Sequence, residues 1–219
     1  PNAAGSYHTA WIKRSREADY DYSALINFFK TLSENEYTED EIGRMVNIDK
    51  LAIMTAVRGY AADWDSVTNT RPKNSFFYRP PNGGRWQLLH WDSDLGFQSG
   101  SAGDPIYTGG RELGAFLKKD YAERKLRYFL SYLWDNLVDV NNSPRTQAFF
   151  EAEENASPHR EYTARASIYA TWFNARDARM LREIDDHLGD PLVVNPVTDV
   201  EGDVISVTGS AGYRAYSVV

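Results

Sequence analysis

Residues 74–97 read NSFFYRPPNGGRWQLLHWDSDLGF and decide how this chain folds. The aromatic and aliphatic runs at 76–79 and 85–91 are typical of two short strands, and turn residues fill the segment 80–84 between them. An Asn-Gly pair between two such runs is among the stronger hairpin signals that a sequence offers. We therefore predict a β-hairpin in the middle of the chain.

Helical patterns precede this hairpin. Residues 23–32 place apolar side chains at i, i+3, i+4 and i+7 behind Asp21, and 38–41 has the sequence of a capping box. Either Asn47 or Asp49 then caps a third helix, which we expect to stop near residue 63. Its predicted apolar stripe consists of Leu51, Ile53, Met54, Val57 and Tyr60.

Helical patterns also follow the hairpin, after a loop rich in Gly, Ser and Asp at 98–110. Apolar periodicity predicts helices over about 112–140, 145–154 and 164–188, with Gly189-Asp190-Pro191 ending the last one. The predicted fold class is mainly α with a small β-hairpin (α+β).

The pattern becomes β after Pro191, with strand-like segments at 204–208 and 213–219. We divide the chain into a main unit, 1–192, and a β-rich tail, 193–219. Two strands alone are marginally stable in water. The tail is therefore expected to open a truncated β module, to pack on the helical body, or to pair with a neighbouring copy in a homo-oligomer.

Composition excludes several classes of protein. A length of 219 residues indicates one main domain, and 24 basic against 31 acidic residues give a net charge of −7, which argues against nucleic-acid binding. Without cysteine there is no disulfide, thiolate metal site or cysteine nucleophile. No apolar run is long enough to span a bilayer, and residues 1–5 have neither the basic start nor the apolar stretch of a signal peptide. The first residue is Pro, so we interpret the chain as a piece of a longer one.

Acidic residues gather at the ends of the predicted hairpin. Because a hairpin brings its two ends together, we expect Asp65, Asn74, Asp92 and Asp94 to converge at its open end. Clustered carboxylates resist ionisation unless a cation neutralises them, and oxygen ligands of this kind suit Mg²⁺, Mn²⁺ or Ca²⁺. Taken without the hairpin, the pair Asp63 and Asp65 could instead have a structural role, ending a helix and capping the turn after it. Trp86 and Trp91 are expected to lie in the core rather than stack on a ligand.

These motifs resemble those of the CotH (spore-coat protein H) kinase family over roughly residues 15–190. The resemblance rests on Asp63-Trp64-Asp65-Ser66, on the NSFFYR strand and on Trp91-Asp92-Ser93-Asp94 after the hairpin. Position 63 is Asp where the family more often has Asn. Members are secreted atypical protein kinases that use ATP and a divalent ion to phosphorylate Ser or Thr.

The resemblance implies a role for each matching residue. Asp65 would be the catalytic Asp that accepts or orients the substrate hydroxyl proton, and Asn74 would bind metal. Asp94 would hold the metal that bridges the phosphates, with Asp92 as the alternative ligand. Residues 1–20 are too few for a kinase N-lobe, so the chain resembles the C-lobe alone. An extracellular or cell-surface location, in bacteria, also follows from the resemblance.

Two other functions remain open at this point. The chain could be a non-catalytic surface or coat protein on a kinase-like scaffold, assembled through its β tail and binding a coat or surface partner. It could also be an extracellular binding module that Ca²⁺ stabilises.

Overall fold

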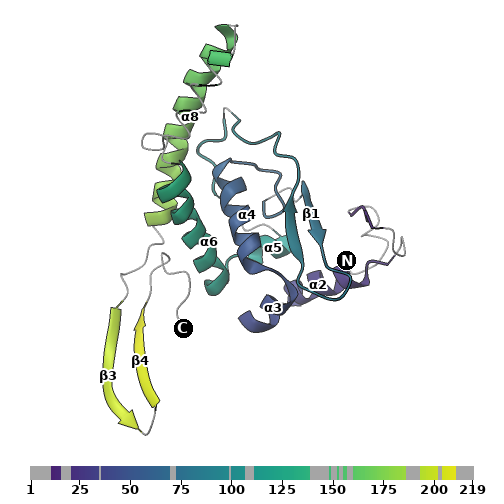
Figure 1. Cartoon of the computed structure of the whole chain (residues 1–219), viewed down its shortest axis with the longest axis vertical. Helices are drawn as coiled ribbons and strands as arrows, with labels where there is room; N and C mark the ends of the chain where they lie inside the picture. Colours follow the sequence, from purple (N-terminus) through teal and green to yellow (C-terminus); the bar gives the residue numbers. More distant parts are fainter. Residues whose placement is uncertain are drawn as a thin grey trace.

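The computed structural model describes residues 11–15, 21–34, 36–69, 73–98, 100–106, 111–138, 160–185, 193–201 and 204–210, together with 148, 152, 155 and 156. Within these residues the chain is mainly helical, with two separate two-stranded antiparallel sheets. Figure 1 shows α4 (Ile48–Tyr60) in the centre, with the first hairpin on one side and α6 (Asp120–Leu133) and α8 (Arg160–Asp185) on the other. The predicted mainly α fold with a small hairpin is confirmed.

Side-chain caps set the starts of the first helices. Asp21 accepts a hydrogen bond from the Ser23 amide as α2 (Ser23–Glu34) begins. Thr38 caps α3 (Glu39–Met45) in a complete capping box with Glu41, as predicted. Asn47, and not Asp49, caps α4, because its side chain accepts a hydrogen bond from the Lys50 amide.

The central hairpin consists of β1 (Ser75–Tyr78) and β2 (Gln87–His90), with Phe76 opposite Leu89. Its tip turns through Pro80 to Gly83, whose φ is +79°, a conformation that glycine adopts without strain. The hairpin is anchored to the junction of α3 and α4. There Trp86 donates a backbone hydrogen bond to Met45 and accepts one from Asn47, at 2.7 and 2.9 Å.

Two apolar clusters share α4. The first joins α2, the inner face of the hairpin and α5 (Arg111–Phe116), and centres on Phe28, Leu51, Leu88 and Phe116. The second packs α4 against α6 and α8. Ile53 and Val57, two members of the predicted stripe, are exposed at 42% and 49%. Leu51 and Tyr60 are buried as predicted, and the buried face of α4 also includes Thr55 and Arg58.

The helical region after the loop is not continuous. The predicted helix over 112–140 is wrong as one element, because turns at 117–119 separate α5 from α6. The π-helical turn η1 (Trp134–Val138) then continues α6. The predicted helix at 164–188 corresponds to α8, whereas the turn at 189–191 and most of the predicted helix at 145–154 lie outside the described residues.

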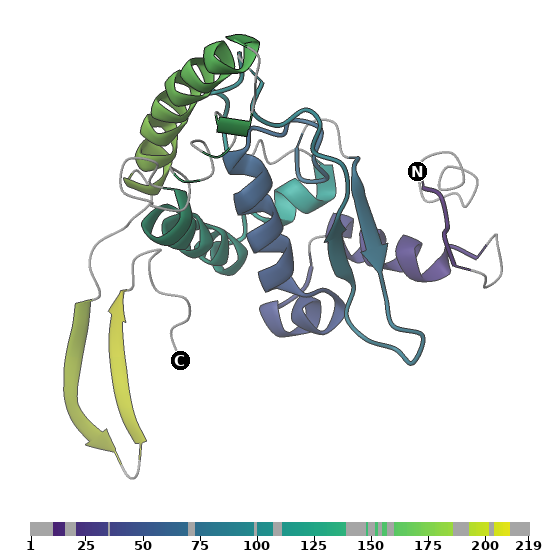
Figure 2. The same ribbon diagram turned by 45° about the horizontal axis from the view of Figure 1, so that its top comes forward.

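The tail forms a second hairpin, β3 (Val193–Glu201) with β4 (Val204–Ser210). The predicted strand at 204–208 is confirmed, but its partner β3 was not predicted, and 213–219 lies outside the described residues. β3 contains Pro196, which removes a ladder donor, and a register shift lies between Pro196 and Val200. Figures 1 and 2 show this hairpin projecting from the helical body, away from β1 and β2.

Buried arginine side chains connect the helices to neighbouring loops. Arg176 of α8 is fully buried and donates hydrogen bonds to the carbonyls of Gly59, Tyr60, Ala102 and Asp104. Burial lowers the pKa of Arg176 to about 10, so this side chain stays charged at neutral pH. None of the helices over the described ranges is long and apolar enough to cross a membrane.

Candidate functional site

A buried arginine closes the open end of the central hairpin. Arg58 lies in the last turn of α4 and is 2% exposed. One terminal nitrogen, Nη1, donates to the carbonyls of Asn74 at 2.5 Å and Trp91 at 3.1 Å, and Nη2 donates to the carbonyl of Asp92 at 2.9 Å. One guanidinium therefore holds the residue before β1 and the residues after β2 against the end of α4.

Two buried carboxylates follow α4. Asp63 Oδ2 lies 2.5 Å from Arg58 Nη2 and accepts a hydrogen bond of 3.0 Å from the Ser93 hydroxyl. Asp65 is fully buried, and Lys73 Nζ lies 2.7 Å from its Oδ2. The Lys73 side chain is 44% exposed, so the ion pair joins a buried carboxylate to a side chain at the surface.

The two carboxyl groups have shifted acidities of opposite sign. Burial raises the pKa of Asp63, and so does its hydrogen bond to Asp65, against the effect of Arg58. Burial also acts to raise the pKa of Asp65, but hydrogen bonds from Lys73 and Asp63 and the charges of Lys73 and Arg58 lower it overall. The charges of Lys73 and Arg58 thus favour the ionised form of Asp65.

Left-handed backbone conformations are concentrated around these residues. Over the described ranges, every non-glycine residue with positive φ flanks this region: Ala62 (52°), Asn74 (57°), Asp92 (49°) and Phe97 (58°). Such conformations cost free energy and persist only where surrounding contacts enforce them, as they often do at functional sites. At Asn74 and Asp92 the carbonyl of the left-handed residue accepts a hydrogen bond from Arg58.

The hairpin brings together some of the predicted site residues. Asn74 and Asp92 meet at Arg58, and Asp94 follows in an exposed turn in which its amide donates to Asp92 Oδ1 at 3.3 Å. Asp65 lies beside Asp63 and Lys73, and its described contacts do not reach Asp92 or Asp94. In the part of the chain that the structure describes, no three His, Cys, Asp or Glu side chains form a group that could hold a metal ion.

The available donors nevertheless fit one kind of metal site. Asp92 and Asp94 are exposed carboxylates, and Asn74 offers a side-chain amide oxygen, the atom of that group able to bind a metal ion. Mg²⁺ is commonly held by one or two carboxylates together with water and substrate phosphates. A pair of carboxylates beside an amide therefore suits an ion that arrives with a phosphate ligand, rather than a cage built wholly from protein groups.

Three side chains of this region were not predicted: Arg58, Lys73 and Ser93. Arg58 had a signal in the sequence, since it follows Leu51 and Thr55 at helical spacing and thus falls on the buried face of α4. An arginine at such a position needs buried acceptors. Nothing in the sequence marked Lys73 or Ser93 as a site residue, apart from their positions: Lys73 precedes Asn74, and Ser93 lies between Asp92 and Asp94.

An exposed apolar face lies on the same hairpin. Phe76, Leu89 and Trp91 are 36%, 41% and 57% exposed, and the Phe76 and Trp91 rings meet edge to face at 5.2 Å. Trp86 packs against the first cluster, as predicted, but the prediction that Trp91 is a core residue is wrong. The reason is the alternation of faces along an extended segment: Trp86 shares the inner face with Leu88, and Trp91 shares the outer face with Leu89.

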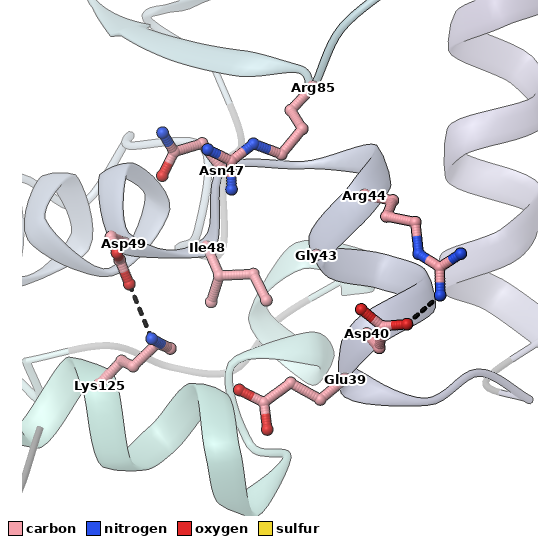
Figure 3. A pocket seen from close by; sticks show the side chains of 9 residues that line it. All are labelled: Glu39, Asp40, Gly43, Arg44, Asn47, Ile48, Asp49, Arg85 and Lys125. Atoms are coloured by element: carbon pink, nitrogen blue, oxygen red, sulfur yellow. Dashed lines mark hydrogen bonds and ion pairs between the residues drawn. The ribbon is translucent and has the colours of Figure 1, made fainter. Parts of the chain in front are cut away.

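A recess lies away from this region, between α3, the start of α4 and α6 (Figure 3). It encloses about 500 Å³ and is lined by acids and bases together. Lys125 pairs with Asp49 at 2.9 Å, and Arg44 pairs with Asp40. Much of its charge is therefore neutralised within the recess, and none of the predicted site residues line it.

Comparison with known proteins gives one match. A family model described as CotH kinase protein matches residues 3–151, which is more than half of the chain and includes the whole of the hairpin and acidic region. No curated protein and no solved structure matches the chain.

Proposed function

This chain belongs to the CotH kinase family, and we propose that it forms the C-lobe of an atypical kinase that uses ATP and a divalent ion. The reaction is transfer of a phosphoryl group to a Ser or Thr hydroxyl of a protein. The observation that carries this proposal is the convergence of Asn74, Asp92 and Asp63 on Arg58, beside the buried Asp65 and its partner Lys73. Phosphoryl transfer depends on such positioning of charged groups more than on covalent chemistry by the protein.

Asp65 is the proposed catalytic residue. The substrate oxygen forms a bond to the γ-phosphorus, the bond from that phosphorus to the bridging oxygen of ADP breaks, and the hydroxyl proton passes to Asp65. Because the Asp65 carboxylate is fully buried behind Lys73, the lysine must swing outward for a hydroxyl to reach it. Its 44% exposure leaves room for that movement.

Asn74, Asp92 and Asp94 are the proposed ligands of Mg²⁺ or Mn²⁺. When bound, the ion would neutralise charge on the phosphates. Arg58 binds Asn74 and Asp92 through their backbone carbonyls and not through their side chains. The exposed rings of Phe76 and Trp91, on the same hairpin, offer an apolar surface for the nucleobase.

The proposal is tested with Asp94→Asn, because this exposed side chain lies in a turn and its loss should leave the fold intact. Binding of Mn²⁺ with ATP is measured by calorimetry, next to thermal unfolding. We expect Asp94→Asn to weaken binding by at least about tenfold with an unchanged Tm. Asp135→Asn, an exposed aspartate on η1, is the matched control and should bind as the wild type does.

Two results would refute the metal role of Asp94. One is that the variant binds Mn²⁺ and ATP as tightly as the wild type does. The other is that its weaker binding is accompanied by a lower Tm in metal-free buffer, because Asp94 would then be a structural residue. A shift of the unfolding midpoint with Ca²⁺, but not with Mg²⁺ and nucleotide, would instead indicate a calcium-stabilised module.

The second hairpin favours an alternative function, that of a non-catalytic coat or surface protein on the same scaffold, outside the cell. Over the described strands, β3 and β4 pair only with each other, so each has an edge to which another strand can add. In this alternative the chain self-assembles through residues 193–219. Deleting them should convert an oligomer to a monomer in analytical ultracentrifugation, and an unchanged oligomeric state would exclude this route.

A further inference from the structure

We propose that Arg58 is the positioning residue of this site, and that it sets the spacing of the metal-binding groups without touching the metal. This inference rests on the proposed function. Arg58 contacts three segments that are distant in sequence: the residue before β1, the residues after β2, and the turn after α4. Two of its partners, Asn74 and Asp92, are candidate ligands themselves.

The contacts explain why the residue is an arginine. Its partners are the carbonyls of Asn74, Trp91 and Asp92 and the carboxylate of Asp63, all bound by Nη1 and Nη2. A planar guanidinium presents these donors in a fixed fork, whereas a lysine offers a single ammonium on a flexible stem. Lysine at 58 would keep the charge and lose part of this set of hydrogen bonds.

The backbone of both candidate ligands depends on the same contacts. Asn74 and Asp92 have φ values of 57° and 49°, in the left-handed region that Asn and Asp adopt more readily than most other non-glycine residues. Their carbonyls are held in this arrangement by Arg58. Without the guanidinium, the two carbonyls would lose the group that they share, and the two side chains would no longer be fixed relative to each other.

Arg176 provides a matched control within the same chain. It is also fully buried and also binds backbone carbonyls at the end of α4, but its other partners, Ala102 and Asp104, lie in the loop after the hairpin. None of its partners is a candidate metal ligand. Arg176→Lys should therefore lower the stability of the fold as Arg58→Lys does, but leave the positions of Asn74 and Asp92 unchanged.

The experiment compares Arg58→Lys and Arg176→Lys in the full chain. Calorimetry measures the affinity for Mn²⁺ with ATP, and thermal unfolding measures stability. We expect Arg58→Lys to lose about ten- to a hundredfold in affinity, and Arg176→Lys to keep wild-type affinity despite a comparable fall in Tm. The proposal would be overturned if Arg58→Lys folds and binds Mn²⁺ and ATP with wild-type affinity. It would also be overturned if both variants lose the same affinity and the same Tm.

A second measurement separates this inference from the proposed function. Hydrogen exchange in metal-free buffer should become faster in Arg58→Lys at both 73–78 and 91–97, and in Arg176→Lys mainly at 101–106. If the wild type binds no metal with nucleotide, the proposed function fails. The hydrogen-exchange rates in metal-free buffer still test whether Arg58 positions both ends of the hairpin. If exchange at only one end of the hairpin responds to Arg58→Lys, the coordinated positioning is refuted.

Discussion

Asn74 and Asp92 are distant in sequence, yet their carbonyl oxygens accept hydrogen bonds from the two terminal nitrogens of one guanidinium, and both residues have left-handed backbones. The entry to β1 and the exit from β2 therefore form one unit with the end of α4. The same guanidinium pairs with Asp63, which places the acidic turn after α4 in this unit as well.

Asp65→Asn tests the proposed proton acceptor. Asparagine has nearly the same shape as aspartate but cannot accept the hydroxyl proton, and loss of a general base typically lowers rates by about 10²- to 10⁴-fold. We expect phosphoryl transfer to fall by that order while the affinity for metal and nucleotide is kept. Radiolabel transfer from ATP measures the first and calorimetry the second. Undiminished transfer would remove Asp65 from the mechanism.

Asp63→Asn should affect stability more than Asp65→Asn does. Asp63 is the carboxylate partner of Arg58, which is 2% exposed, so its loss leaves a buried charge without its counter-charge, at a typical cost of about 3–5 kcal/mol. The partner of Asp65 is the half-exposed Lys73, which water can solvate. Denaturant unfolding of both variants measures the difference, and equal losses would mean that Arg58 finds other partners.

Two helical glycines should respond oppositely to alanine. A Cβ at Gly59 would lie 2.7 Å from Ile106 Cγ2, and such overpacking costs about 1–3 kcal/mol. A Cβ at Gly43 would meet Ile48 Cδ1 at 3.8 Å, an ordinary contact, so alanine there should add up to about 1 kcal/mol of helix stability. Chemical denaturation should show Gly59→Ala less stable and Gly43→Ala more stable than the wild type. The same sign for both would contradict this packing.

The capping box of α3 predicts a pH dependence of stability. Hydrogen bonds from the amide and hydroxyl of Thr38 lower the pKa of Glu41 in the folded state, below the ordinary 4.5. Ionised Glu41 therefore stabilises the fold above that value, and this contribution is lost as the pH falls through the folded pKa. Glu41→Gln should thus lower Tm at neutral pH and converge with the wild type in acid.

Glu39→Gln is the control for this pH dependence. It removes a charge of the same sign from the same first turn of α3, but Glu39 is not part of the capping box. Its Tm difference from the wild type should lack the capping contribution. Matching pH profiles for the two variants would show that charge alone, and not the cap, is responsible.

Local signals in the sequence predicted much of the fold. The caps at Thr38 and Asn47 and the Asn82-Gly83 turn depend on a few adjacent residues, and each was found where predicted. The break between α5 and α6 had no comparable signal, because apolar periodicity runs through 117–119 without a glycine or proline. β3 was missed because Pro196 and a register shift interrupt its pattern.

The site could be predicted only in part, for a different reason. The hairpin correctly implied that the residues before β1 and after β2 would meet, as Asn74 and Asp92 do. The burial of Asp65 and its pairing with Lys73 depend on how the turn after α4 packs, which no local pattern encodes. Whether Asp65, Asn74, Asp92 and Asp94 act together stays a prediction that the variants above test.

The position of Arg58 also couples ligand affinity to the integrity of a helix. A ligand that fixes Asn74 and Asp92 restrains the guanidinium that they share, and so resists fraying of the last turn of α4. Thermodynamic linkage is reciprocal, so a change that releases Arg58 from Asn74 and Asp92 must lower the affinity. Core substitutions that displace the Arg58 side chain, remote from any phosphate, would then weaken binding by degrees, whereas changes that leave its contacts in place would not.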